Sequence, residues 1–204
     1  MRKYEFTGET KVYEGRTLNR IRRIEDGLIG GWIETEKNLS HSGGCFVYDE
    51  SMVYENARVM DNAEVRGNAQ VYGKATIREY SQVYGNAEIY DEALIYGYAQ
   101  VYENAKVCGN AEVFQYASIF GEALISDEAK VYGFSNVYNC AQITEEARVF
   151  DFSCINGAYI SGSVEVCGNA CIHEDKFIYG EGELKGVMYS NLTHDKTVII
   201  GTSL

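Results

Sequence analysis

Histidine is the side chain best suited to proton transfer near neutral pH, and this sequence of 204 residues contains three: His41, His173 and His194. A general base must lie within hydrogen-bond reach of the hydroxyl or amine that it deprotonates. His173, beside Glu174 and Asp175, is the best available candidate. A solitary histidine among surface acids is more often simply solvated, so the sequence favours no catalytic residue.

Metal chemistry has little support either. The six cysteines, at positions 45, 108, 140, 154, 167 and 171, form no Cys-x-x-Cys pair, which favours free thiols over a zinc site or a disulfide framework. The acidic pairs Asp91-Glu92, Asp127-Glu128 and Glu145-Glu146 could attract a cation, but we interpret them as a solvated charged edge. The sequence therefore predicts neither a metal nor a cofactor.

The net charge of −12 is unevenly distributed. Residues 1–40 hold eight Lys or Arg against seven Asp or Glu, whereas residues 41–204 hold ten against twenty-three. Such an acidic surface repels phosphate backbones, so we expect no general nucleic-acid binding, although it could imitate DNA towards a basic partner. The only basic cluster comprises Arg16, Arg20, Arg22 and Arg23, and the sequence does not reveal its role.

No apolar run reaches the eighteen or so residues that span a bilayer, and Met1–Phe6 has no apolar signal core. We therefore expect a cytoplasmic protein that does not associate with membranes.

A six-residue repeat organises most of the chain. From Val47 to Ile155 every sixth residue is Val or Ile, nineteen positions in succession. An Ala or Ser stands two positions before each of them from Val53 onward. This period fits neither an amphipathic helix nor a plain alternating strand, but it does fit a short strand followed by a corner.

Alternation along each short strand places the small and the β-branched residues on the inner face and the residue between them on the outer face. The intervening residues are mostly polar, for example Arg58, Glu64 and Gln70. Pairs such as Gly67-Asn68 and Gly85-Asn86 then supply residues that tolerate the positive φ of a tight corner. The predicted core is a thin column of Val, Ile and Ala.

This pattern resembles the hexapeptide repeat of the left-handed parallel β-helix, a family in which three hexads form one triangular coil. The sequence supports an eighteen-residue period independently, because the third residue after every third aliphatic position is aromatic over five successive coils. These residues are Tyr80, Tyr98, Tyr116, Phe134 and Phe152. The left-handed sense of the coil is implied by the resemblance alone.

The repeat slips by one residue between Ile155 and Ile160 and then continues to Leu184. From Cys45 to Leu184 it makes nearly eight coils, a rod roughly 37 Å long at about 4.8 Å per coil. We predict an all-β fold, a single-stranded left-handed parallel β-helix of nearly eight triangular coils at residues 41–185. An N-terminal β meander and cap at 1–40 and a C-terminal hairpin or cap at 186–204 should cover its ends.

Three cap strands are expected near Lys3–Thr7, Thr10–Tyr13 and Thr17–Ile24, and two hairpin strands at Val187–Ser190 and Thr197–Ile200. Trp32, the only tryptophan, should plug the first coil.

The lead-in to the coils carries a closer resemblance. Gly30-Gly31-Trp32-Ile33-Glu34 and Asn38-Leu39-Ser40-His41, followed by tyrosine-rich hexads, resemble uncharacterised hexapeptide-repeat proteins of bacteriophages, prophages and bacteria. Those proteins are often labelled transferases on fold analogy, which is weak evidence for chemistry. The acyltransferases of this fold use a histidine near a subunit junction with acyl-CoA along the wall, so the resemblance implies an alternative: a CoA-dependent acyltransferase with His173 as base.

One corner of the coil carries two neighbouring columns of aromatic residues, which exceed the apolar surface that a monomer usually exposes and so predict a protein interface. The predicted contact residues are Arg78, Tyr80, Tyr96, Tyr98, Phe114, Tyr116, Tyr132, Phe134, Phe150 and Phe152. Self-association is expected, as a trimer in preference to a dimer. The favoured function is a non-enzymatic oligomeric binding scaffold in a bacterial or phage-infected cell. If phage-encoded, it could counter host defence by binding a host protein or sequestering a small-molecule signal.

Overall fold

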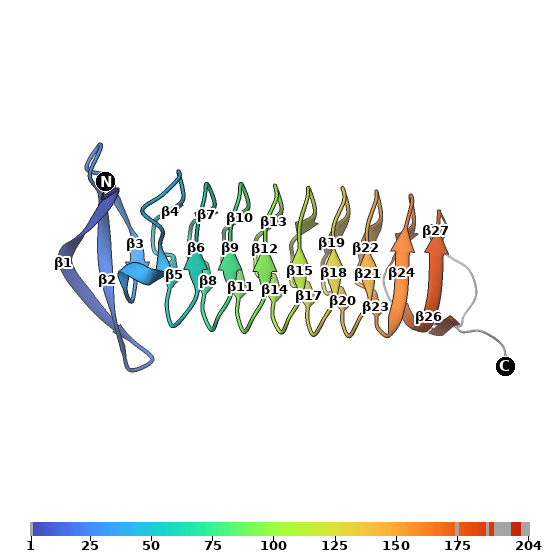
Figure 1. Cartoon of the computed structure of the whole chain (residues 1–204). Helices are drawn as coiled ribbons and strands as arrows, with labels where there is room; N and C mark the ends of the chain where they lie inside the picture. Colours follow the sequence, from blue (N-terminus) through green and yellow to red (C-terminus); the bar gives the residue numbers. More distant parts are fainter. Residues whose placement is uncertain (1, 174–175, 187, 190–196, 201–204) are drawn as a thin grey trace.

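The computed structural model describes residues 2–173, 176–186, 188–189 and 197–200, which form an elongated parallel β-solenoid of about eight coils (Figure 1). Each coil contributes one short strand to each of three walls. Along each wall the strands pair in parallel with their equivalents one coil away, as Val83 pairs with Val101. The prediction of an all-β parallel coil is confirmed.

The walls are named here in the order in which the chain visits them from Met52 onward. The first wall contains β5 (Met52–Val53), β8 (Gln70–Val71), β11 (Glu88–Ile89), β14 (Lys106–Val107), β17 (Leu124–Ile125), β20 (Gln142–Ile143), β23 (Tyr159–Ile160) and the start of β26 (Phe177–Lys185). The second wall contains β6 (Arg58–Val59), β9 (Thr76–Ile77), β12 (Leu94–Ile95), β15 (Glu112–Val113), β18 (Lys130–Val131), β21 (Arg148–Val149), β24 (Ser163–Cys167) and the end of β26. The third wall contains β4 (Phe46–Val47), β7 (Glu64–Val65), β10 (Gln82–Val83), β13 (Gln100–Val101), β16 (Ser118–Ile119), β19 (Asn136–Tyr138), β22 (Cys154–Asn156), β25 (Cys171–Ile172) and β27 (Met188–Tyr189).

The inner and outer faces follow the repeat as predicted. The inward Val, Ile and Ala side chains, such as Val65, Ala69 and Ile77, have no exposed surface. Serine takes the place of alanine at a few inward positions, where its hydroxyl donates to a backbone carbonyl; Ser81 Oγ lies 2.7 Å from the Arg78 carbonyl oxygen. A buried hydroxyl is tolerated there because its hydrogen bond is made.

The register shortens once, where the sequence loses one residue. From β4 up to this point strand partners are eighteen residues apart, whereas Ile143 pairs with Ile160, seventeen residues later. Gly157, at φ 67°, turns the shortened corner, and its N–H donates to the Tyr138 carbonyl oxygen. The coil therefore absorbs the deletion in a corner and leaves the walls in register.

The N-terminal cap differs from the predicted meander. The two strands expected at Lys3–Thr7 and Thr10–Tyr13 are one strand, β1 (Tyr4–Tyr13), with a bulge between Phe6 and Thr10 where Gly8 has φ 90°. β1 pairs antiparallel with β2 (Arg16–Arg23), and β2 pairs antiparallel with β3 (Ile29–Ile33). β3 also pairs in parallel with β5, so parallel pairing begins within the segment assigned to the cap.

Trp32 does not fill the coil, contrary to the prediction. It faces outward from β3 and packs in a separate cluster with Leu18, Met52 and Tyr54, beneath β2. The end of the main core is filled instead by Tyr4, Ile21 and Phe46, all fully buried. The periodic pattern could not reveal this, because Tyr4 and Ile21 precede the repeat and Phe46 stands at a middle position, which the pattern predicts to face outward.

The predicted C-terminal strands are present, but each continues the solenoid. β27 pairs in parallel with β25, and β28 (Thr197–Ile200) pairs in parallel with β26. Residues 190–196, where the turn of the hairpin was predicted, lie outside the described residues. The described residues contain one helical turn, η1 (Glu36–Asn38), near the cap, and no helix among them has the length and apolarity to cross a membrane.

Candidate functional site

The corner between the second and third walls carries the predicted aromatic columns, called here the aromatic edge. Its outer column comprises Tyr80, Tyr98, Tyr116, Phe134 and Phe152, and its inner column comprises Tyr96, Phe114, Tyr132 and Phe150. The two columns are two residues apart along the chain, on either side of the left-handed residue that turns the corner, such as Gly97 at φ 70°. The repeat therefore brings all nine rings to one edge of the rod.

Both columns are continuous stacks. In the outer column successive ring centroids lie 4.9–5.2 Å apart and their planes agree within 7°. The inner rings are spaced 4.7–4.9 Å with planes equally close to parallel, and they are half-buried. The spacing matches the distance between parallel strands, so each coil supplies one ring per column.

The outer column is exposed. Each of its rings keeps 50–63% of its surface accessible. Because an aromatic side chain carries about 150–250 Å² that burial would cover, five such rings expose roughly 400–600 Å² of mostly apolar surface. That is as large as the largest patch of a typical monomer, and patches of this size are often functional.

Polar side chains border the inner column. The guanidinium of Arg78 lies 4.9 Å from the ring centroid of Tyr96, one coil further along. The Tyr96 hydroxyl donates to Glu112 at 3.1 Å, and Lys130 Nζ lies 2.6 Å from the same carboxylate. Burial, and next the hydrogen bond to Glu112, raises the pKa of Tyr96 to about 12. The phenol therefore stays a neutral donor at physiological pH.

The other two corners have different surfaces. At the corner from the third to the first wall, the amides of Asn68, Asn86 and Asn104 form a ladder with N···O distances of 3.2 and 3.0 Å. Two similar aromatic ladders accompany these corners; their rings are half-buried except that of Tyr54, which is buried. They comprise Tyr54, Tyr72 and Tyr90 on one and Tyr84, Tyr102, Phe120 and Tyr138 on the other.

The acidic pairs at the corner from the first to the second wall have a structural use. The carboxylates of Asp91, Asp127 and Glu145 each accept a backbone N–H from the next coil, at 2.7–3.2 Å. Across the part of the chain that is described, no group of three or more His, Cys, Asp or Glu residues could hold a metal ion.

The two histidines in the described part of the chain, His41 and His173, lie at opposite ends of the rod. His173 follows β25, near the far end of the rod, and its Nε2 lies 3.5 Å from Cys171 Sγ. Burial raises the pKa of the Cys171 thiol to about 11, so this neighbour is protonated at neutral pH. His41 stacks on Tyr4 in the cap, and its Nδ1 accepts the Lys3 N–H. His194 and the acids beside His173 lie outside the described residues.

The basic cluster holds the cap together. Arg20 pairs with Glu50 at 2.6 Å, Arg22 with Glu5, and Arg23 with Asp26 at 2.6 Å. Arg20 also lies over the Trp32 ring, whose Nε1 donates to Glu50 at 2.9 Å. The hydrogen bond from Trp32, followed by that from Arg20, lowers the pKa of Glu50.

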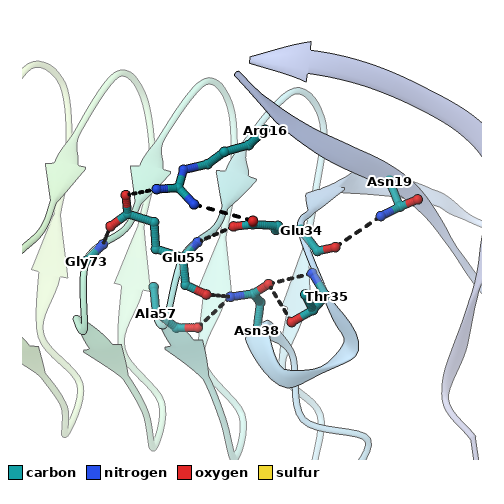
Figure 2. A network of polar contacts seen from close by, with 8 residues as sticks. All are labelled: Arg16, Asn19, Glu34, Thr35, Asn38, Glu55, Ala57 and Gly73. Atoms are coloured by element: carbon teal, nitrogen blue, oxygen red, sulfur yellow. Dashed lines mark hydrogen bonds and ion pairs between the residues drawn. The ribbon is translucent and has the colours of Figure 1, made fainter. Parts of the chain in front are cut away.

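Arg16 belongs to a larger network that joins the cap to the first two coils (Figure 2). Its guanidinium lies between Glu34 and Glu55, at 3.4 and 2.6 Å. Glu34 accepts the Glu55 N–H at 2.7 Å, and Glu55 accepts the Gly73 N–H at 2.8 Å. Each carboxylate oxygen thus receives one of these bonds.

Asn38 completes the network from η1 (Figure 2). Its Nδ2 donates to the carbonyl oxygens of Glu55 and Ala57 at 3.1 and 2.9 Å, and its Oδ1 accepts the Thr35 N–H at 2.8 Å. Most of these contacts could not be predicted from the sequence, because their partners lie 3 to 39 residues apart at irregular separations; the contact from Gly73 to Glu55 is the exception, since it follows the eighteen-residue period. No model of a known protein family matches the chain, and no characterised protein matches it.

Proposed function

We propose that this protein is a non-enzymatic scaffold whose rigid rods associate side by side through the aromatic edge, with the oligomer serving to bind a partner protein or a small molecule. The proposal includes the hexapeptide-repeat ancestry, the left-handed coil and the phage or bacterial setting that the resemblance implies. The observation that carries it is the exposure of five stacked aromatic rings along one edge.

Size supports a second copy as the occupant of this edge. A stable interface buries about 800 Å² on each partner, so roughly 400–600 Å² of exposed ring surface supplies about half to three-quarters of it. The outer column also contains no charged residue from Tyr80 to Phe152, which matters in a chain of net charge −12. Copies of the chain therefore repel one another least where these edges meet.

Periodicity favours a second copy of the chain, and the order of the rings favours a parallel one. A second rod has the same coil spacing, so five successive rings remain level with their equivalents only if the two partners share this repeat. In a parallel arrangement Tyr80 meets Tyr80 and Phe152 meets Phe152, whereas an antiparallel one would place the Tyr80 hydroxyl against Phe152. Cyclic symmetry about an axis along the rods satisfies this, and we favour three copies over two.

Sedimentation equilibrium tests the proposal. Wild-type chain of 22.8 kDa should sediment as about 68 kDa, three copies. Tyr116→Asp puts a charge at the centre of the outer column and should yield monomers. Asn110→Asp introduces the same charge at the equivalent exposed position of the preceding corner and should leave the oligomer intact. A monomeric wild type, or equal dissociation of both variants, would refute association through this edge.

A further inference from the structure

We propose that the pocket where the cap meets the first corner binds a small molecule through a phosphate group. The pocket encloses about 330 Å³ and is lined by Arg16, Glu34, Thr35, Lys37, Glu55, Asn56 and Arg58. This volume is at the lower end of the range for small-molecule sites. The site is independent of the aromatic edge, which lies on another corner of the rod.

The acidic part of this pocket is partly neutralised. Glu34 and Glu55 share the Arg16 guanidinium between them, and their remaining oxygens accept the backbone N–H groups of Glu55 and Gly73 (Figure 2). Neither carboxylate is left with an unbonded oxygen. A ligand that enters the pocket therefore meets two hydrogen-bonded carboxylates that keep one net negative charge beside Arg16, and not two free anions.

Lys37 and Arg58 are the unmatched charges. Lys37 comes from η1 and Arg58 from β6, and the bridge between Leu39 and Val59 holds these two segments together. Both side chains line the pocket and are exposed, and neither makes an ion pair within the described residues. The lining has three cations against two carboxylates, a net positive site in a strongly acidic protein.

Phosphate fits this pair of cations better than carboxylate does. A guanidinium fork binds two oxygens of an anion. Both oxygens of a carboxylate are then occupied, whereas a terminal phosphate keeps another oxygen for the lysine ammonium. The negative charge of the rest of the rod is screened beyond about 8 Å at physiological salt, so the nearby cations dominate. Thr35 and Asn56 can contact the remainder of the molecule.

Equilibrium dialysis against radiolabelled inorganic phosphate tests this site, with radiolabelled acetate as the carboxylate probe. Wild type should bind one phosphate per chain saturably and acetate at least about tenfold more weakly. Lys37→Ala with Arg58→Ala should weaken phosphate binding by at least about tenfold. Lys106→Ala with Arg148→Ala removes the same charge from outward residues that pair with Glu88 and Glu165, and should bind as wild type does.

Arg58→Lys keeps the charge but removes the fork, and should give intermediate affinity. Circular dichroism of each variant should match wild type, since the altered side chains are exposed. Three results would overturn the proposal: no saturable phosphate binding by wild type, equal losses in the two double variants, or acetate bound as tightly as phosphate.

Discussion

The carboxylate of Glu103 accepts a 2.8 Å hydrogen bond from the backbone N–H of Gly121, its equivalent in the next coil. Both residues occupy the middle of a corner and have left-handed φ values of 59° and 71°. The same contact recurs at other corners, for example from Asp49 to Gly67 and from Glu55 to Gly73. Much of the acidity of the rod therefore satisfies backbone donors that a parallel coil leaves at its corners.

Gly121→Ala should destabilise the rod strongly. A Cβ there would lie 2.6 Å from the Asn139 backbone nitrogen, in addition to the cost of a left-handed φ. Gly15→Ala is the control, because φ is 75° and a Cβ would meet nothing within 4 Å. We expect urea unfolding to show a loss for Gly121→Ala at least about 2 kcal/mol greater than for Gly15→Ala. Equal losses would show that the neighbouring coil does not constrain this corner.

Asn38→Ala should loosen the cap. The substitution leaves two carbonyl oxygens and one N–H without their partner, at a side chain that is 1% exposed. An unsatisfied buried group costs about 1–3 kcal/mol, and only the bond to Ala57 is fully buried while the other two are partly exposed, so the free energy of unfolding should fall by about 2–4 kcal/mol. Asn110→Ala, at an exposed corner, should change it by less than about 0.5 kcal/mol. A loss for Asn38→Ala no greater than that of the control would contradict the network.

The half-buried ladders should stabilise the rod without mediating association. Phe120 stacks between Tyr102 and Tyr138 at 5.0 and 4.9 Å, on a corner away from the aromatic edge. Phe120→Leu keeps an apolar side chain but removes both ring contacts, and should cost about 1–2 kcal/mol. Its sedimentation should match wild type. Dissociation of this variant would show that the interface lies on the wrong corner.

Stability should decline at alkaline pH. Burial is the main cause that raises the pKa of Tyr72 and of Tyr96 to about 12. A phenol with a raised folded-state pKa stabilises the protein fully below its unfolded pKa of about 10, and this contribution is lost as pH rises towards 12. Urea midpoints should therefore fall between about pH 10 and pH 12, less steeply for Tyr72→Phe with Tyr96→Phe. Tyr98→Phe, which removes an exposed phenol, is the control. A decline of the same slope in the double variant would contradict this assignment.

The repeat made most of the rod predictable, because the inward placement of Val83 and of Ala99 follows from their positions in the six-residue repeat. The aromatic edge was predictable for the same reason, because Tyr98 and Tyr116 recur every eighteen residues. The cap was not. Arg16 and Glu55 meet across 39 residues with no period to signal it, and Trp32 packs beneath a strand whose position only tertiary contacts define. The internal ion pairs of the basic cluster could not be predicted from the sequence for the same reason.

The central claim is that copies of this chain meet side by side and in parallel along the aromatic edge. Disulfide crosslinking tests it most directly, in a Cys140→Ser background because Cys140 is exposed. Tyr80→Cys and Phe152→Cys lie at the two ends of the outer column, four coils and about 19 Å apart. Parallel association predicts that each variant crosslinks to itself and that a mixture yields no bond between positions 80 and 152. The absence of any crosslink, or a bond between those two positions, would contradict the account.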